Sequence, residues 1–167
     1  TFVRKRITAT EHNLNVRNIE HLFVELIPTR KRKESIFLLN VYSHPSAKVR
    51  SRFLTLFKKA LNVAGTNPLV NGGDFNLPHP AWGYGYSTTA AQNLWQDSQD
   101  LGLTFITDPT FPTRLGISTS RDTTPDLTFT MNVTNAQWSN TKSPLHHCNT
   151  YPSHSCSNRQ TPRVLLD

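Results

Sequence analysis

Two apolar runs separated by an amphipathic segment most constrain how this chain can fold. The first run, residues 35–42 (SIFLLNVY), is apolar on both faces, which predicts a central strand of a sheet covered on both sides. The second run, residues 68–70 (PLV), predicts another short buried strand. Between them, apolar residues recur at every fourth position and predict a helix that opens at Pro45-Ser46: Val49, Phe53, Phe57 and Leu61. Strand, helix and strand in this order form a crossover unit, and the predicted fold class is therefore α/β.

The other segments agree with this class. Residues 19–27 alternate between two faces and predict a strand that pairs with residues 35–42 as an antiparallel hairpin, around a basic turn at 30–33. A second helix is expected at residues 88–101, because its apolar residues share one face. Two more strand candidates follow, at residues 103–107 and 126–131.

The charge of the chain favours a polyanionic partner. With 18 Lys and Arg against 11 Asp and Glu the net charge is +7, which indicates nucleic acid first, DNA or RNA. The same clusters of basic residues also suit solvated turns and helix faces, so the charge alone does not indicate cleavage. The sequence has no stretch long enough to cross a membrane and no secretory signal at its start. We therefore expect an intracellular protein without a membrane partner, nuclear when it acts on DNA.

The composition changes sharply near residue 139. From there to residue 162 the sequence is rich in Ser, Thr, Asn, Pro and His and has almost no aliphatic residues. We expect one domain at residues 1–138 and a polar, irregular or disordered tail at 139–167. The two cysteines, Cys148 and Cys156, lie in this tail and make no disulfide framework. Together with nearby histidines they suggest zinc, but their spacing fits no standard finger.

Residues 72–76 (GGDFN) are the strongest chemical signal. Two glycines let the backbone bend tightly and approach a ligand closely. Asp74 and Asn76, two residues apart at the end of a strand, are expected to point to the same side. An acid that can hold a metal or move a proton, beside a neutral donor for a phosphate oxygen, suits phosphodiester chemistry. Asp and Asn after Gly-Gly are also ordinary turn formers, so this segment alone fits both interpretations.

Several short motifs occur in a fixed order between residues 20 and 134. They are NVY at 40–42, GDFN at 73–76, PHPAWG at 78–83, PTR at 112–114 and TPDL at 124–127. In this order and spacing they resemble the endonuclease/exonuclease/phosphatase superfamily, and most closely the endonuclease domains of non-LTR (LINE-like) retrotransposon polyproteins. The resemblance implies a DNase I-like α/β sandwich of two packed mixed β-sheets flanked by helices, incomplete here at the N-terminus and at the C-terminus.

The resemblance also implies roles for individual residues. Asp74 looks like the carboxylate that activates the attacking water or serves the leaving group, and it is the candidate metal ligand. Asn76 would donate to the scissile phosphate, and the Tyr42 hydroxyl would reach the same phosphate. Asp126 looks like the aspartate that orients a catalytic histidine. The implied cofactor is Mg²⁺, or Mn²⁺ in its place, because the ligation is hard and rich in oxygen.

Each of these roles has a plainer alternative. Tyr42 could anchor the end of a strand with its ring in the core, and Asp126 could cap a turn after Pro125. Arg114 and His79 are weaker candidates for substrate binding. Arg114 equally suits an ion pair within its loop, while a histidine such as His79 is more often on the surface or hydrogen-bonded. Trp82 is expected to serve packing.

The chain departs from the family's pattern at both ends. The family places a metal-binding glutamate on an upstream strand, and neither Glu11 nor Glu20 matches its context. The family also ends with a Ser-Asp-His motif, which is absent here, so that only His146 or His147 could replace the catalytic histidine.

The sequence therefore fits two alternative functions. One is metal-dependent hydrolysis of a phosphodiester, that is, DNA nicking by a retrotransposon-derived endonuclease. The other is a catalytically inactive, truncated remnant that at most binds nucleic acid, because a partial catalytic site retains little activity. A third interpretation, a lipid or inositol phosphodiesterase, is disfavoured by the Trp-Gly and Pro-Thr-Arg motifs.

Overall fold

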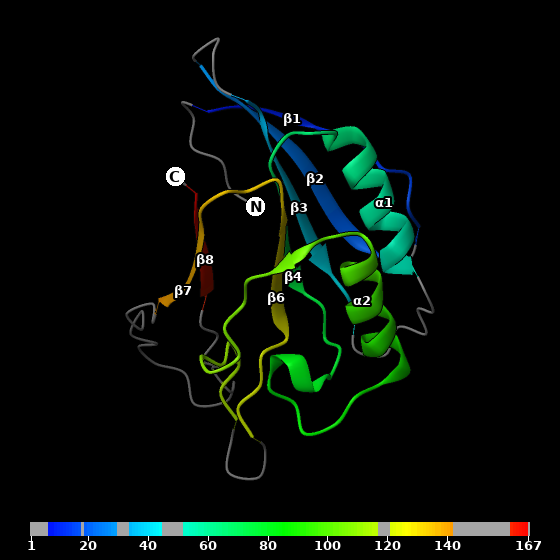
Figure 1. Ribbon diagram of the computed structural model, residues 1–167, viewed down its shortest axis with the longest axis vertical. Coiled ribbons are helices and arrows are strands. Elements are labelled where there is room, and N and C mark those ends of the chain that lie inside the picture. Colours follow the sequence, from blue (N-terminus) through cyan, green and yellow to red (C-terminus); the bar gives the residue numbers. More distant parts are fainter. Residues whose placement is uncertain are drawn as a thin grey trace, which may run out of the picture.

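The large sheet of this protein is mixed and has helices on one face. The computed structural model describes residues 7–17, 19–29, 34–44, 52–116, 121–141 and 161–166. In chain order the elements are β1 (Thr8–Glu11), β2 (Glu20–Ile27), β3 (Ile36–Tyr42), α1 (Arg52–Ala64), β4 (Leu69–Asp74), the 3-10 helix η1 (Pro80–Trp82), α2 (Thr89–Asp100), β5 (Thr104–Phe105), β6 (Asp126–Met131), β7 (Ala136–Thr141) and β8 (Thr161–Leu166). The large sheet has six strands in the order β1-β2-β3-β4-β6-β5, and β7 and β8 form a separate pair (Figure 1). The predicted α/β class is confirmed.

The centre of the sheet follows the predicted topology. Strands β2 and β3 are antiparallel neighbours, as expected for a hairpin. Strands β3 and β4 are parallel, and α1 connects them. Strand β6 then enters beside β4 in the antiparallel sense and separates it from β5. The first strand, β1, was not predicted, because its four residues are all exposed and show no apolar pattern.

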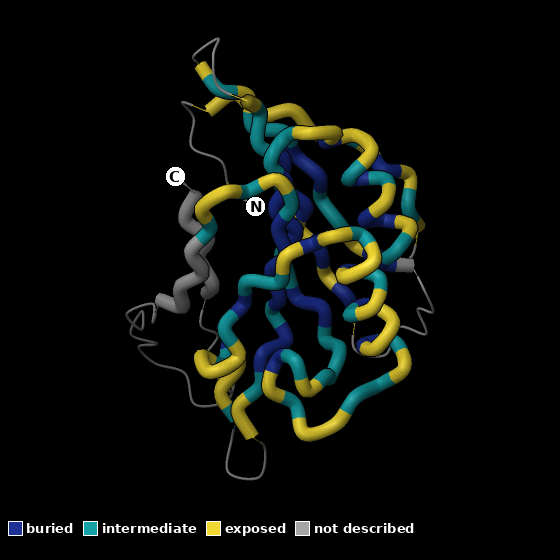
Figure 2. Tube along the Cα trace, viewed as in Figure 1, coloured by how far each residue is buried: buried dark blue, intermediate teal, exposed yellow. Residues whose placement is uncertain are grey.

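Both helices cover the same face of the sheet (Figure 1). The side chains on this face include Phe37, Leu39 and Phe129, which are buried in one core cluster together with the inner residues of α1. The ring centroids of Phe57 and Phe129 lie 6.1 Å apart, so the helix and β6 are in direct contact. The buried part of the chain accordingly runs between the sheet and the helices (Figure 2). The predicted start of the first helix at Pro45-Ser46 lies outside the described residues.

The second helix begins where the sequence indicated. The Thr88 hydroxyl accepts a hydrogen bond from the Ala91 N–H at 3.3 Å and caps α2. The inner face of α2 buries Ala91, Leu94 and Ser98. No helix in the described part of the chain is long and apolar enough to cross a membrane.

The polar tail contains regular structure at both ends, where we expected irregular chain from residue 139. Strand β7 pairs with β8 in the antiparallel sense, with Trp138 opposite Val164. Backbone pairing satisfies N–H and C=O groups whatever the side chains are, so a polar composition does not exclude it. The segment between the strands, with the candidate histidines and both cysteines, lies outside the described residues, as does the basic turn at 30–33.

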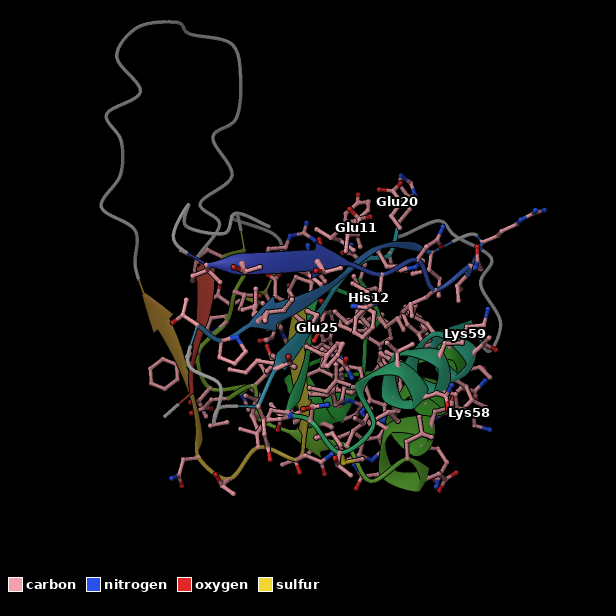
Figure 3. The ribbon with its side chains drawn as sticks, turned by 90° about the horizontal axis from the view of Figure 1, so that it is seen from above. Glu11, His12, Glu20, Glu25, Lys58 and Lys59 are labelled. Atoms are coloured by element: carbon pink, nitrogen blue, oxygen red, sulfur yellow. The ribbon has the colours of Figure 1, made fainter. Side chains whose placement is uncertain are left out.

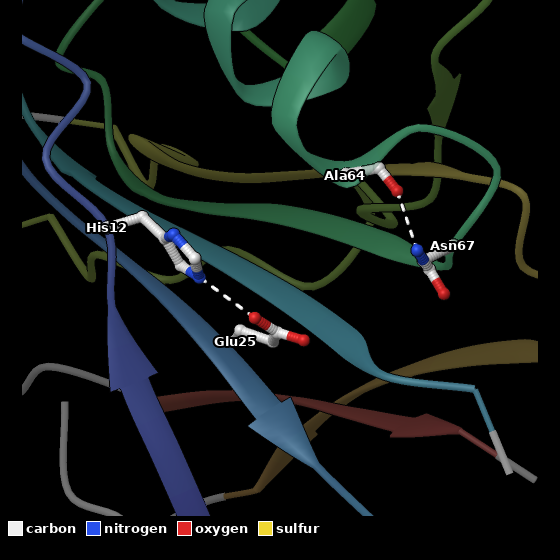
Figure 4. A network of polar contacts seen from close by, with 4 residues as sticks. All are labelled: His12, Glu25, Ala64 and Asn67. Carbon is white, nitrogen blue, oxygen red and sulfur yellow. Dashed lines mark hydrogen bonds and ion pairs between the residues drawn. The ribbon is translucent and has the colours of Figure 1, made fainter.

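Polar contacts join the segment after β1 to β2 and to α1, and fix the turn after α1. The His12 Nε2 and a Glu25 carboxylate oxygen are 2.9 Å apart, and the Asn67 amide donates to the Ala64 carbonyl oxygen after α1 (Figure 4). A hydrogen bond from Ser35, assisted by His12, holds the pKa of Glu25 below its ordinary value. On α1, the Lys59 ammonium donates to the carbonyl oxygens of residues 14 and 15, which draws this segment onto the helix.

Candidate functional site

Three candidate residues form one row across the ends of neighbouring strands. Tyr42 of β3 is in register with Asp74 of β4, and Asp74 stands opposite Asp126 of β6. Residues in register on adjacent strands present their side chains to the same face. The next residues along, such as Val41 and Leu127, are buried in the core on the helix face. Tyr42, Asp74 and Asp126 therefore lie side by side on the opposite face, as the sequence motifs suggested but could not show.

The row is open to a ligand at Tyr42 and closed in at Asp74. Tyr42 is 39% exposed, whereas Asp74 is only 9% exposed.

The two glycines of the motif lie within β4, and the predicted tight bend is wrong. The strand continues through Gly72 and Gly73 to Asp74. Gly73 has a φ of 148°, and a Cβ built on it would lie 1.9 Å from the Val41 carbonyl oxygen. A glycine is required here because the backbone of β3 occupies the space of a side chain. The motif thus brings two strands close together at the site instead of turning the chain.

Backbone hydrogen bonds join the strand ends on either side of Asp74. The Ser43 N–H donates to the Asp74 carbonyl oxygen at 2.8 Å, and the Phe75 N–H donates to the Pro125 carbonyl oxygen at 3.0 Å. The first bond extends the pairing of β3 with β4, and the second extends the pairing of β4 with β6. Residues 42–43, 74–76 and 125–126 are therefore held as one unit.

Asn76 is fixed by a bond of its own side chain. Its amide nitrogen donates to the Ser43 carbonyl oxygen at 2.9 Å, and its backbone is left-handed, with a φ of 50°. The sequence predicted that the side chains of Asp74 and Asn76 point to the same side, as alternate residues of a strand do. The strand ends before Asn76, however, so the hydrogen bond to Ser43 sets the direction of the Asn76 amide. An amide group has two N–H hydrogens, so this bond is compatible with a second one to a phosphate oxygen.

Phe75 anchors the motif between its two polar residues. Its ring is fully buried, with centroids 5.3 Å from Phe53, 6.4 Å from Phe57 and 5.9 Å from Phe129. Since one side chain of the motif is locked into the core, the flanking Asp74 and Asn76 cannot drift from the strand end. In the GDFN motif the aromatic residue thus anchors the segment in the core, and the polar residues on either side of it stay at the strand end.

Arg114 lies on a loop that is tied to the start of β6. The N–H of each of Arg114 and Thr123 donates to the carbonyl oxygen of the other at 2.9 Å. The Asp126 N–H donates to the Thr113 hydroxyl at 3.3 Å. Arg114 is exposed, and no ion pair of its guanidinium is found among the described residues. Substrate binding by Arg114 stays a prediction. The alternative, an ion pair between Arg114 and an acidic residue of the same loop, gains no support from the described residues.

Tyr84 belongs to the site region and was missed in the sequence. Burial raises the pKa of its phenol, while a hydrogen bond with the Thr123 side chain and the charge of Arg114 oppose this rise. The carboxylate of Asp74 is also close enough to affect it. The only sequence signal was the alternation Gly83-Tyr84-Gly85-Tyr86, which by itself indicates a loop.

His79 has a clear structural role. Its Nδ1 accepts a hydrogen bond from the Ala81 N–H at 3.1 Å and so caps η1. Its ring lies 4.6 Å from that of Trp82, and burial lowers the pKa of the imidazole. Trp82 is fully buried and donates its indole N–H to the Leu77 carbonyl oxygen, which confirms the expected packing role. Substrate binding by His79 stays a prediction.

The donor set suits a hard divalent cation. Among the described residues no three His, Cys, Asp or Glu side chains come together as a metal-binding group. Mg²⁺, however, is often held through one or two carboxylates, completed by water and substrate phosphate. Asp74, with Asp126 beside it, meets that requirement. Glu20 is in register with Tyr42 one strand further, but both Glu20 and Glu11 point away from the body of the molecule (Figure 3).

Comparisons with known proteins agree with this geometry. A family model described as endonuclease–reverse transcriptase matches residues 36–158. The endonuclease domain of TRAS1, a telomere-specific non-LTR retrotransposon, has a similar structure with a TM-score of 0.73 and 19% identity, over 98% of this chain and 70% of that one. No curated protein matches the chain.

Two further solved structures are more distant. Truncated TDP2 from Caenorhabditis elegans has a TM-score of 0.52 and 14% identity, over 97% of this chain and 68% of that one. An endonuclease/exonuclease/phosphatase family protein from Bacteroides thetaiotaomicron has a TM-score of 0.50 and 13% identity, over 87% of this chain and 54% of that one. At such identities the likeness concerns the fold, and it confirms the predicted DNase I-like α/β architecture.

Proposed function

We propose that this chain, which belongs to the endonuclease–reverse transcriptase family, nicks DNA by metal-dependent hydrolysis of a phosphodiester. The single observation that carries the proposal is the row of Tyr42, Asp74 and Asp126, with the Asn76 amide tied in beside it. Two carboxylates beside two neutral donors, the Tyr42 hydroxyl and the Asn76 amide, suit the hydrolysis of a phosphodiester.

Each residue has a task in the proposed reaction. Asp74 accepts the proton of the attacking water, whose oxygen adds to phosphorus while the bond to the 3′ oxygen breaks and this oxygen takes a proton from solvent water. The Asn76 amide and the Tyr42 hydroxyl donate to phosphate oxygens, where negative charge accumulates. A divalent ion, Mg²⁺ or Mn²⁺, would be held by Asp74 and would neutralise part of that charge. The products are a 3′-hydroxyl and a 5′-phosphate, and the natural setting for such a reaction on DNA is the nucleus.

The second candidate function is binding of nucleic acid without cleavage. It is favoured by one observation: in the described ranges no third carboxylate and no histidine joins Asp74 and Asp126. The ligand would be DNA or RNA, bound through basic side chains. Among the described residues Lys58 and Arg114 are exposed, and more than half of the 18 Lys and Arg lie outside the described residues.

A nicking assay on supercoiled plasmid with Mg²⁺ distinguishes these functions. We expect the protein to convert the plasmid to the open circle, and Asp74→Ala to slow this by about 100-fold or more. Asp100→Ala is the matched control, because it removes an exposed carboxylate on α2 whose bond goes to Gln96. Chelation of Mg²⁺ should abolish nicking, and Mn²⁺ should restore it. If the protein and Asp74→Ala both retard DNA in a gel but leave it supercoiled, the chain only binds.

A further inference from the structure

Exposed apolar side chains gather on the loops beside the candidate site. In the described part of the chain the large exposed apolar residues include Tyr86, at 62%, and Phe111, at 56%. Leu115 and Tyr42 are also exposed, at 38% and 39%. Phe111 and Leu115 flank the exposed Arg114 in the sequence. Single exposed apolar residues are ordinary, but two exposed aromatic rings and a guanidinium beside one site are not.

The two loops that carry these rings touch each other. A Cβ on Gly83 would lie 3.5 Å from the Pro109 carbonyl oxygen, so the loop after η1 packs on the loop after β5. Tyr84 then reaches from the first loop to Thr123, beside Arg114. The rings of Tyr84 and Tyr86 meet edge to face with centroids 6.3 Å apart. Through Tyr84, the exposed ring of Tyr86 is therefore connected to the region of Asp74 and Arg114.

The loop that carries Phe111 is held by local bonds. The N–H and the hydroxyl of Thr110 both donate to the Asp108 carboxylate, at 2.9 Å and 2.7 Å. The Phe111 N–H donates to the Asp108 carbonyl oxygen at 3.2 Å. The hydrogen bonds from Thr110 also hold the pKa of Asp108 below its ordinary value. Because these bonds hold the backbone next to Phe111, a base can stack on its ring at a low cost in conformational entropy.

We propose that Tyr86 and Phe111 form a stacking surface for unpaired or unstacked nucleobases, with Arg114 binding the adjoining phosphate. This rests on the proposed function in so far as the ligand is a nucleic acid. Flat apolar rings beside the exposed guanidinium of Arg114 match the alternation of bases and phosphates in a single strand. A fully paired duplex hides its base faces, so the surface selects DNA that is single-stranded or locally distorted. The substrate class is thereby narrowed to strands with an exposed base next to the scissile phosphate.

The test measures binding without cleavage. Three oligonucleotides containing 2-aminopurine are titrated with Asp74→Ala protein in the absence of divalent metal: a single strand, a duplex with one bulged 2-aminopurine, and a fully paired duplex. We expect tighter binding to the first two and a change in 2-aminopurine fluorescence on stacking. Adding Phe111→Ala or Tyr86→Ala should weaken binding to the single strand by about tenfold each. Both changes should leave the weaker binding to the paired duplex nearly unaltered.

Two control variants make the result specific. Tyr86→Phe keeps the ring and should bind as before, and Val63→Ala removes an exposed apolar side chain on α1, at 42% exposure, and should also bind as before. Equal affinity for the three oligonucleotides, unchanged affinity in both alanine variants, or the absence of any binding would overturn the proposal. Failure of the nicking proposal is seen separately, in the plasmid assay, because the fluorescence titration contains no catalytic step.

Discussion

The backbone of Val41 occupies the space in which a side chain on Gly73 would lie. This contact joins β3 and β4 one residue before the row of candidate side chains. Replacing Gly73 by Ala should force the strands apart and reduce the free energy of unfolding by about 3 kcal/mol or more. Gly72→Ala is the matched control: its Cβ would meet Thr128 at an ordinary 3.7 Å, and its effect should stay below about 1 kcal/mol. Urea denaturation followed by circular dichroism measures both, and equal stability of the two variants would contradict the structure.

Asn71 places an amide inside the apolar core. It is fully buried in register with Leu39 and Phe129, and neither its amide nitrogen nor its amide oxygen has a hydrogen-bond partner among the described residues. Asn71→Leu has the same branching without polar atoms and should raise the free energy of unfolding by about 1–3 kcal/mol. Asn40→Leu, on the exposed side of β3, should change it by less than about 0.5 kcal/mol. A destabilised Asn71→Leu protein would mean that the amide has a partner, such as an internal water.

Asn76 allows the amide to be tested apart from the backbone. Asn76→Gly retains the left-handed conformation and removes the donor, so nicking should fall by about 100-fold. The loss of the Ser43 bond should cost only about 1 kcal/mol of stability. Asn76→Ala should lose the same activity and a further 1–2 kcal/mol, roughly, from the strained backbone. Plasmid nicking and thermal melting of both variants check this. A fully active Asn76→Gly protein would mean that the amide has only a structural role, through its bond to Ser43.

His79 should make stability sensitive to mild acid. Because burial lowers its pKa in the folded protein, the unfolded chain binds the proton more readily. The stabilising contribution is therefore complete above the ordinary histidine pKa of about 6.5 and is lost as the pH falls through the lower, folded value. His79→Asn keeps a capping acceptor for η1 but cannot titrate, so its melting temperature should depend less on pH in this window. The melting temperatures of both proteins, measured in the same buffers across this pH range, check the prediction. An equal dependence of melting temperature on pH in the two proteins would refute it.

The sequence determined the central elements because each has a strong periodic pattern. The hairpin of β2 and β3, the helices α1 and α2, and the strand β6 were predicted from apolar spacing alone. Short polar strands such as β1 and β7 were missed, since their pairing comes from backbone hydrogen bonds and leaves no pattern in the side chains. The glycines of β4 were misjudged as a bend for a related reason: only the neighbouring strand shows why the side chain must be absent.

The candidate residues of the site could be named from the sequence, but their arrangement in space could not. Family motifs pointed to Tyr42, Asp74 and Asp126, yet their alignment is a property of strand register, which residues far apart in the sequence do not reveal. Tyr84 and Phe111 could not be chosen from the sequence, because their relevance arises from two loops that meet only in the folded protein.

Strand β6 enters the large sheet between β4 and β5, although both precede it in the chain. During translation, Asp74 must therefore stand at an open strand edge until β6 has been synthesised and inserted. An open edge of this kind is a hazard for pairing with other nascent chains and a natural target for chaperones.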